Sequence, residues 1–265
     1  MASAPKASMP VLYKELVPLN SNDHGTWKGR TTDKAPWIAG QHAIPLTVEE
    51  FPIAQRDFPI VFSSGDRPVP LALMGLNEGV NVFFNEDGSA IGTPYIPAYV
   101  RRYPFLLAKL QPESDNLSLC FDPTSELVGE FDEGNALFTE DKEPSEHTQQ
   151  LLNFCEKFED AGNKTQMFMK ELEDHDLLMD GEISIQRRDN PDQPFVYRGF
   201  RMVNQEKLRE LRGDQLRKWN ENGLLPLIFA HLFSLELMRT VFAKQVEMGK
   251  GPSMDGAANG TMPQA

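Results

Sequence analysis

The most concentrated set of chemistry-bearing side chains lies in residues 95–105, which read YIPAYVRRYPF. Three tyrosines recur at every fourth position and two arginines are adjacent: Tyr95, Tyr99, Tyr103, Arg101 and Arg102. A helix would place the three rings on one face. The planar guanidinium groups suit a carboxylate or a phosphate. The segment therefore predicts either a contact site for an anion or a partner, or an aromatic packing stripe whose arginines pair with the acidic residues at 111–145.

Three further side chains are candidates for acid–base or binding roles: His24, Asp57 and His231. His24 lies in a glycine-containing loop, where functional residues are common, although a turn role is the simpler interpretation. His231 lies in an apolar, helix-like run. It is either a core histidine with a satisfied hydrogen bond or a general base that faces a pocket.

The standard catalytic and metal-binding motifs are missing from the sequence. It contains no Gly-x-Ser-x-Gly elbow, His-Glu-x-x-His pair, Walker loop or Gly-x-Gly-x-x-Gly fingerprint. The cluster Asp174-His175-Asp176 does not suggest a metal site, because neighbours on a helix point about 100° apart. The acidic turns at 85–88 and 132–135 do not match a calcium loop. We therefore expect no metal and no cofactor.

Composition narrows the function classes. The chain has 265 residues and a net charge of −13, which disfavours nucleic acids and anionic lipids as partners. Its two cysteines, Cys120 and Cys155, cannot build a disulfide framework and are expected to be buried free thiols. Residues 1–10 lack the apolar core of a secretory signal, and the 13-residue charge-free run at 223–235 is too short to span a bilayer. A cytoplasmic location without membrane insertion is predicted.

The elements that must position these residues begin with a β-rich half. Strands are expected at 11–19 and 58–63, and an antiparallel meander at 69–92 is expected because its apolar runs are separated by Asn/Asp-Gly turns. Thr47-Val48-Glu49-Glu50 matches a capping box, and Pro52 limits that helix to a turn or two. Ala98 to Leu110 is expected to be helical, with a break or kink at Pro104.

The second half is predicted to be rich in helices. Short strands at 117–121 and 136–138 precede a helix that begins behind Ser145 and runs to Leu172, with an interruption possible at Gly162. The later elements are a hairpin and three helices: 183–188 with 195–203 across 189–194, then 205–212, 215–221 and 226–248. The fold class is therefore α+β. It is expected to form one large domain over residues 11–248, between a flexible segment at 1–10 and a disordered tail at 249–265.

Several strings, in this order, resemble the SapC family of bacterial proteins. They are VPLN at 17–20 with His24, RDFPIVF at 56–62, PAYVRRYPF at 97–105, LCFD at 119–122, RGFR at 198–201, and NG at 222–223 leading to AHLFSL at 230–235. The third string is the most specific of them. The family is named for a locus that encodes a bacterial surface layer and its type I export apparatus, and no established reaction or catalytic residue set comes with the resemblance.

The resemblance and the residues leave three hypotheses. The first is a soluble accessory or binding protein of surface-layer or outer-membrane transport systems, whose contact residues lie in the 95–105 segment. The second is an enzyme whose site is assembled from scattered side chains: His24, Asp57, Arg101, Arg102 and His231. The third is a surface-layer component that is exported without a Sec signal. A protein partner or a small anionic ligand fits the first, and the oligomeric state is open.

Overall fold

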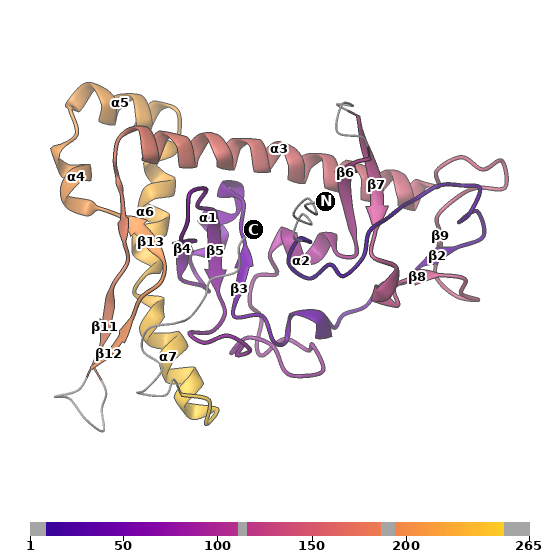
Figure 1. The fold of residues 1–265 in the computed structure, drawn as a ribbon, viewed down its shortest axis with the longest axis horizontal. Helices are drawn as coiled ribbons and strands as arrows, with labels where there is room; N and C mark the ends of the chain where they lie inside the picture. Colours follow the sequence, from indigo (N-terminus) through magenta and orange to yellow (C-terminus); the bar gives the residue numbers. More distant parts are fainter. Residues whose placement is uncertain (1–8, 111–115, 187–193, 252–265) are drawn as a thin grey trace, which may run out of the picture. The chain divides into compact units, whose positions relative to one another are not determined.

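The computed structural model describes residues 9–110, 116–186 and 194–251, and these residues form two compact units (Figure 1). Unit 1 comprises residues up to Asp33 together with Arg101–Asp160, and unit 2 comprises Lys34–Val100 together with the residues from Ala161 onward. One domain was predicted over residues 11–248, and both units contain parts of this range. The domain boundaries at 11 and 248 stay a prediction. The fold class is confirmed as α+β, with antiparallel sheets mostly in the first half and helices mostly in the second.

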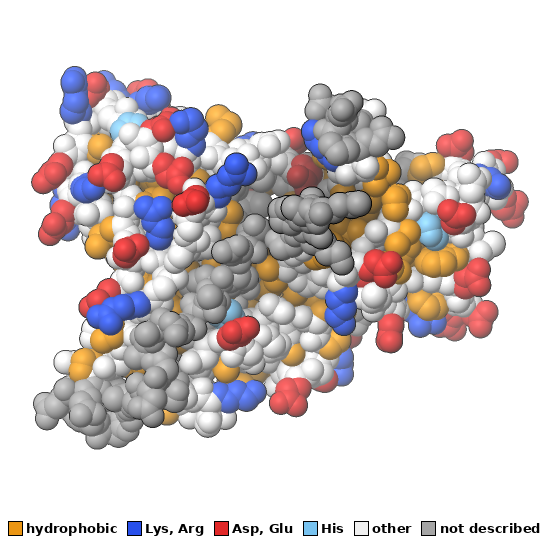
Figure 2. Space-filling view, in the orientation of Figure 1, with side chains coloured by type: hydrophobic (Ala, Val, Ile, Leu, Met, Phe, Trp, Pro, Cys, Tyr) orange, Lys and Arg blue, Asp and Glu red, His pale blue; other side chains and the backbone are white. Residues whose placement is uncertain are grey.

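Unit 1 contains two small antiparallel sheets. The first has the order β1–β7–β6, formed by Val17–Pro18, Leu117–Phe121 and Phe105–Lys109. The second has the order β8–β2–β9, formed by Val128–Gly129, Lys28–Gly29 and Asn135–Ala136. The short 3-10 helix η3 (Pro123–Ser125) lies between β7 and β8. Acidic side chains gather around the β8–β2–β9 sheet, where most of the carboxylates of residues 116–145 are exposed (Figure 2).

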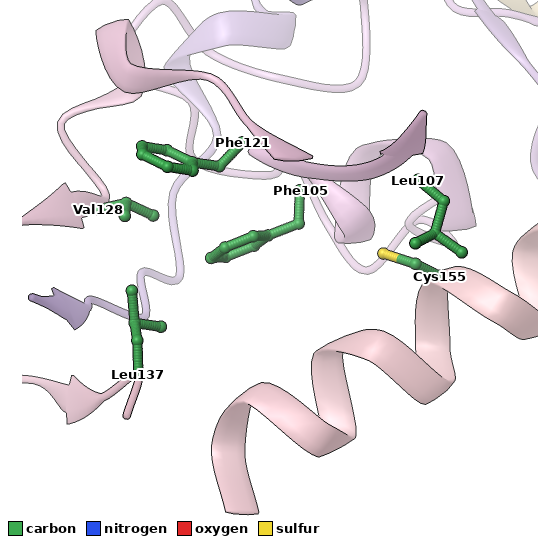
Figure 3. Packing of buried hydrophobic residues seen from close by; sticks show 6 residues of the cluster. All are labelled: Phe105, Leu107, Phe121, Val128, Leu137 and Cys155. Atoms are coloured by element: carbon green, nitrogen blue, oxygen red, sulfur yellow. The ribbon is translucent and has the colours of Figure 1, made fainter. Parts of the chain in front are cut away.

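The core of unit 1 combines both sheets with the first part of helix α3 (Glu146–Asp174). Figure 3 shows Phe105 and Phe121 side by side, with the Cys155 sulfur of α3 directed toward Leu107. Side chains alternate between the two faces of a strand, so Cys120 points away from the face that holds Phe121. Both cysteines are buried free thiols, as the sequence predicted, and burial raises the pKa of each thiol.

Unit 2 is built on a five-stranded antiparallel sheet with the order β10–β13–β4–β5–β3. The strands are Leu178–Asp180, Arg201–Val203, Ile60–Phe62, Pro70–Leu73 and Ala43–Pro45. A separate hairpin pairs β11 (Ile183–Ile185) with β12 (Phe195–Tyr197), which confirms the predicted hairpin in part, and most of its connecting turn lies outside the described residues. The predicted second strand at 195–203 is divided, because residues 201–203 form β13 and pair with β10 and β4. Phe62 of β4 packs with Phe168, which also meets Phe51 edge-on at 5.7 Å.

The helices of unit 2 are mostly short. Before the sheet is complete the chain forms η1 (Pro36–Ile38), η2 (Val48–Glu50) and α1 (Phe51–Ala54). After it come α4 (Gln205–Glu210), α5 (Gly213–Glu221), α6 (Leu224–Ser234) and α7 (Leu237–Glu247). By length and composition alone, the stretch from Leu224 to Glu247 could also cross a membrane, and 39% of its most apolar window is buried.

Helix α3 begins where the sequence predicted. The Ser145 hydroxyl accepts a hydrogen bond from the Thr148 N–H at 3.2 Å, which satisfies one of the donors that the first turn of a helix leaves open. The interruption considered at Gly162 does not occur, because the helix is continuous to Asp174.

Two predictions about the meander and the following helix are wrong. Val80–Phe84 forms no strand, apart from one bridge between Phe84 and Ala90, and β5 pairs with β3 and β4 instead. The Asn81 side-chain oxygen accepts the N–H groups of residues 83 and 84, which removes these donors from any strand pairing. The helix expected to continue to Leu110 is only α2 (Ala98–Arg102), and the residues after Pro104 form β6 because proline supplies no helical N–H and disfavours helix in the residue before it.

Two other boundaries also differ. The strand expected at 11–19 shrinks to β1, because the chain turns at Pro10–Tyr13 and Leu12 has a φ of +78°. The final helix is divided into α6 and α7 at Leu235 and Glu236. Just before this break, the Ser234 hydroxyl donates to the His231 carbonyl oxygen at 2.6 Å, a local bond that perturbs helical geometry.

Candidate functional site

The first half of the 95–105 segment is held within unit 2 by the carboxylate of Glu50. One oxygen of this buried side chain accepts the N–H of Thr47 at 2.9 Å and its hydroxyl at 3.0 Å, which completes the predicted capping box. The other oxygen accepts the Tyr95 hydroxyl at 3.0 Å and the Ala98 N–H at 2.7 Å. A buried carboxylate is costly unless it is hydrogen-bonded, and these four bonds satisfy it. Glu50 therefore ties the start of α2 to η2.

Asp57 fixes the same segment at a second point. One oxygen of its carboxylate accepts the Tyr95 N–H at 2.9 Å. The structure thus brings together two of the predicted site residues, Tyr95 and Asp57, along with Glu50. The hydrogen bond from the Tyr95 N–H positions the main chain of the segment, so the Asp57 carboxylate has a structural role.

The second half of the segment belongs to unit 1, where the two arginines differ. Arg102 is only 8% exposed, and its guanidinium lies 4.1 Å from the centre of the Phe158 ring. One of its nitrogens is 3.5 Å from a carboxylate oxygen of Glu159 on α3. Burial raises the pKa of Glu159, and the charge of Arg102 opposes that rise. The packing alternative is thus realised for Arg102, which pairs with Glu159 on α3.

Arg101, unlike the buried Arg102, lies at the protein surface. Its side chain is exposed, and its guanidinium lies 5.4 Å from the centre of the Phe154 ring. Stacking of this kind orients the planar donor group while leaving it at the protein surface. Of the two arginines, Arg101 is therefore the one at the surface.

The three tyrosines do not form a helical stripe, because α2 has five residues and includes only Tyr99. Tyr95 precedes the helix and Tyr103 follows it. Tyr103 is 9% exposed and meets Tyr13 edge-on at 5.2 Å. Burial, together with the neighbouring Asp122 carboxylate, raises the pKa of Tyr103 to about 12. Tyr99 and Tyr103 therefore act as packing residues.

His24 is a buried turn residue of unit 1, with an exposed fraction of 5%. Its Nδ1 accepts the N–H of Asn20 at 3.2 Å, and its ring meets the rings of Trp27 and Phe121 edge-on. The Asn20 side chain in turn accepts the N–H groups of residues 22 and 23. His24 therefore has a structural role, because its ring holds the turn through Asn20 and packs against Trp27 and Phe121.

His231 is a core histidine of unit 2. It has no exposed surface, and both ring nitrogens contact the main chain: Nδ1 donates to the Ile60 carbonyl at 2.8 Å, and Nε2 accepts the Val203 N–H at 3.1 Å. A backbone N–H can only donate and a carbonyl can only accept, so these contacts determine the neutral tautomer. Burial lowers the pKa of His231 to about 4, against the opposing effect of the bond to Ile60. Its ring links α6 to β4 and β13.

Sequence reasoning missed the roles of Glu50 and Glu159. The capping-box motif identified Glu50 but could not show that its second oxygen would hold a segment some 45 residues away in the chain. No local pattern marked Glu159, since it is one of several acidic residues on α3. Among the residues that the structure describes, no group of three or more His, Cys, Asp or Glu side chains could hold a metal ion.

A separate depression lies on the surface of α5. It is lined by Gly213, Asp214, Arg217, Lys218 and Glu221, which come from this one helix. Charged side chains of both signs on one exposed helical face are typical of a solvated surface.

The sequence of the chain matches the model of a known family. The chain belongs to the SapC family, whose model matches residues 19–241. No match was found among the curated proteins or among the solved structures.

Proposed function

We propose that this SapC-family protein is an accessory binding protein of the cell interior that serves a surface-layer or outer-membrane transport system. It acts through surface contacts and not through a covalent step. The observation that carries the proposal is the position of His231, the general-base candidate on the apolar helix. Both of its ring nitrogens contact main-chain groups and none of its surface is exposed, so it stabilises the fold.

Three other candidates also have structural roles. Asp57 accepts a main-chain N–H, Arg102 is buried against Phe158 beside Glu159, and His24 is buried in a turn. Binding chemistry, in contrast, requires a side chain that is both oriented and exposed. Arg101 meets this requirement, since its guanidinium is exposed over the Phe154 ring.

The proposed contact is therefore between Arg101 and a carboxylate or phosphate of the partner. A planar guanidinium can form two parallel hydrogen bonds to either group, which gives a defined orientation. The location in the cell interior is supported by the two free thiols, because cysteines stay reduced in reducing compartments.

The test is to purify the tagged full-length protein from its native host under mild conditions and to identify stoichiometric partners by mass spectrometry. Arg101→Glu reverses the charge at the proposed contact, whereas Arg209→Glu makes the same change at an exposed position on α4. We expect a component of a surface-layer or outer-membrane system to be recovered with the wild type and with Arg209→Glu, and to be lost with Arg101→Glu. Equal recovery with both variants contradicts the contact.

Cell fractionation with protease treatment of intact cells tests the location. We expect the protein in the soluble fraction and protected from the protease. A protease-sensitive pool at the cell surface contradicts the proposal and favours a surface-layer component instead.

A further inference from the structure

The solvent-exposed face of α6 is apolar. In a chain with a net charge of −13, charged side chains are expected on such a face. The run from Gly223 to Leu235 contains no Asp, Glu, Lys or Arg. Its inner face is buried against the sheet of unit 2 through His231, Ile228 and Ser234. Its outer face exposes Phe229 to 40% and Phe233 to 69%.

The two phenylalanines form a single ridge. They are four residues apart, their ring centroids lie 5.7 Å apart and their planes differ by 25°. Pro226, one turn earlier on the same face, is exposed too, and Leu225 and Leu232 on the flank are half-buried. Contiguous exposed apolar surface of this kind marks an interaction site rather than an ordinary solvent face.

The charges at the two ends of this ridge indicate what covers it. Glu221 lies at the N-terminal end and Glu236 at the C-terminal end, and both are exposed. A bilayer of anionic lipids would meet a carboxylate at each end, in a chain whose net charge is already −13. Cations are also present at both ends: Arg217 and Lys218 on α5 precede Glu221, and Arg239 follows Glu236.

We propose that a second copy of this chain covers the α6 ridge, in a two-fold antiparallel contact. A two-fold axis between Phe229 and Phe233 places each Phe233 against Phe229 of the second copy, so that four rings pack together. In this register residue 239 lies opposite residue 223, so the arrangement sets Arg239 close to Glu221 of the second copy, once at each end of the contact. The charge-free run then faces itself, and opposite charges meet at both ends.

The proposal does not depend on the partner of Arg101, and it is tested with the purified full-length protein. Sedimentation equilibrium over a concentration series is expected to give about twice the chain mass of 29.9 kDa. Phe233→Glu is expected to weaken dimerisation at least about 100-fold, since each substitution counts twice in a two-fold contact. Met167→Glu, an equally drastic change at an apolar side chain of α3 that is 70% exposed, is the matched control and should remain dimeric.

A mixing experiment tests the antiparallel register. Tagged Phe229→Cys and untagged Phe233→Cys should form an interchain disulfide when they are mixed under mild oxidation, and each alone should form it much less. Circular dichroism on every variant distinguishes loss of the contact from loss of the fold. A wild type that stays monomeric up to about 100 µM overturns the proposal, as does a dimer that Phe233→Glu leaves intact. Flotation of the monomer with anionic vesicles that depends on Phe233 would instead assign the ridge to a lipid surface.

Discussion

The two units solve the problem of a buried polar side chain in different ways. In unit 2, His231 is neutral and both of its nitrogens bond to main-chain groups of β4 and β13. In unit 1, Arg102 keeps its charge and is surrounded by the Phe158 ring and the Glu159 carboxylate. A neutral group with matched hydrogen bonds costs little to bury, whereas a charge needs a partner and an aromatic surface to offset its desolvation. The first centre therefore stabilises its unit more strongly than the second.

The largest expected effect is from His231→Ala. The substitution leaves a cavity and deprives the Ile60 carbonyl and the Val203 N–H of their partners, so the free energy of unfolding should fall by about 3–4 kcal/mol. Urea denaturation measures the change, and Thr240→Ala at an exposed position of α7 is the control. A loss below about 1 kcal/mol would show that the histidine is not the centre of this packing.

The second effect is a pH dependence that belongs to unit 2. The unfolded His231 has a pKa near 6.5 and the folded one about 4, so between these values only the unfolded chain binds the proton. The stabilisation is therefore complete above about pH 6.5 and is lost as the pH falls toward 4, by a total of about 3 kcal/mol. His231→Gln can donate to Ile60 and accept from Val203 without titrating, and its unfolding free energy should lack this contribution. Identical pH profiles for the two proteins would refute the assignment.

The third effect concerns unit 1 and is smaller. Arg102→Met keeps the apolar stem but removes the charge over Phe158 and beside Glu159. Because the Glu159 side chain is 40% exposed and can be solvated, we expect a loss of about 1–3 kcal/mol. Both cysteines lie in unit 1, so their reactivity toward a thiol reagent in dilute urea reports its opening. Arg101→Met, on the exposed neighbour, should cost less than about 1 kcal/mol, and the reverse ranking would contradict the comparison.

The smallest effect tests the start of α3. Ser145→Ala removes the acceptor for the Thr148 N–H and should lower the free energy of unfolding by about 1 kcal/mol. Ser145→Asp retains an acceptor at the N-terminus of the helix and should restore most of the loss. Thermal denaturation followed by circular dichroism measures both variants. If the aspartate variant is no more stable than the alanine variant, the hydroxyl does not act as a cap.

Elements with a strong local signal were predicted well. The capping box at Thr47–Glu50, the Ser145 helix start and the pairing of 183–185 with 195–197 all depend on residues close together in the chain. The errors occurred where a side chain competes with a regular element. Asn81 takes up the N–H groups that a strand would need, and Ser234 bonds to the carbonyl of His231 just before the final helix divides.

In the candidate site, too, the residue types could be predicted from the sequence and their arrangement could not. Its composition was visible in the sequence, but the regular spacing of its tyrosines suggested a helix much longer than the five residues of α2. Pro104 was recognised as a breaker, and the sequence did not reveal that the residues after it pair with β7. That pairing joins residues in the 105–121 range with β1 near the start of the chain, a contact that no local pattern specifies.

The sequence by itself determined the α+β class, the SapC family, the buried thiols and the residue types available for chemistry, because these follow from composition, periodicity and short motifs. Only the tertiary structure decided what those residue types do. Whether His231 is a base or a core residue, and whether Arg101 or Arg102 faces the surface, depends on burial and on partners 28 to 171 residues away in the chain. Burial and pairing are properties of the packed chain, and they set the charge state and accessibility of each side chain.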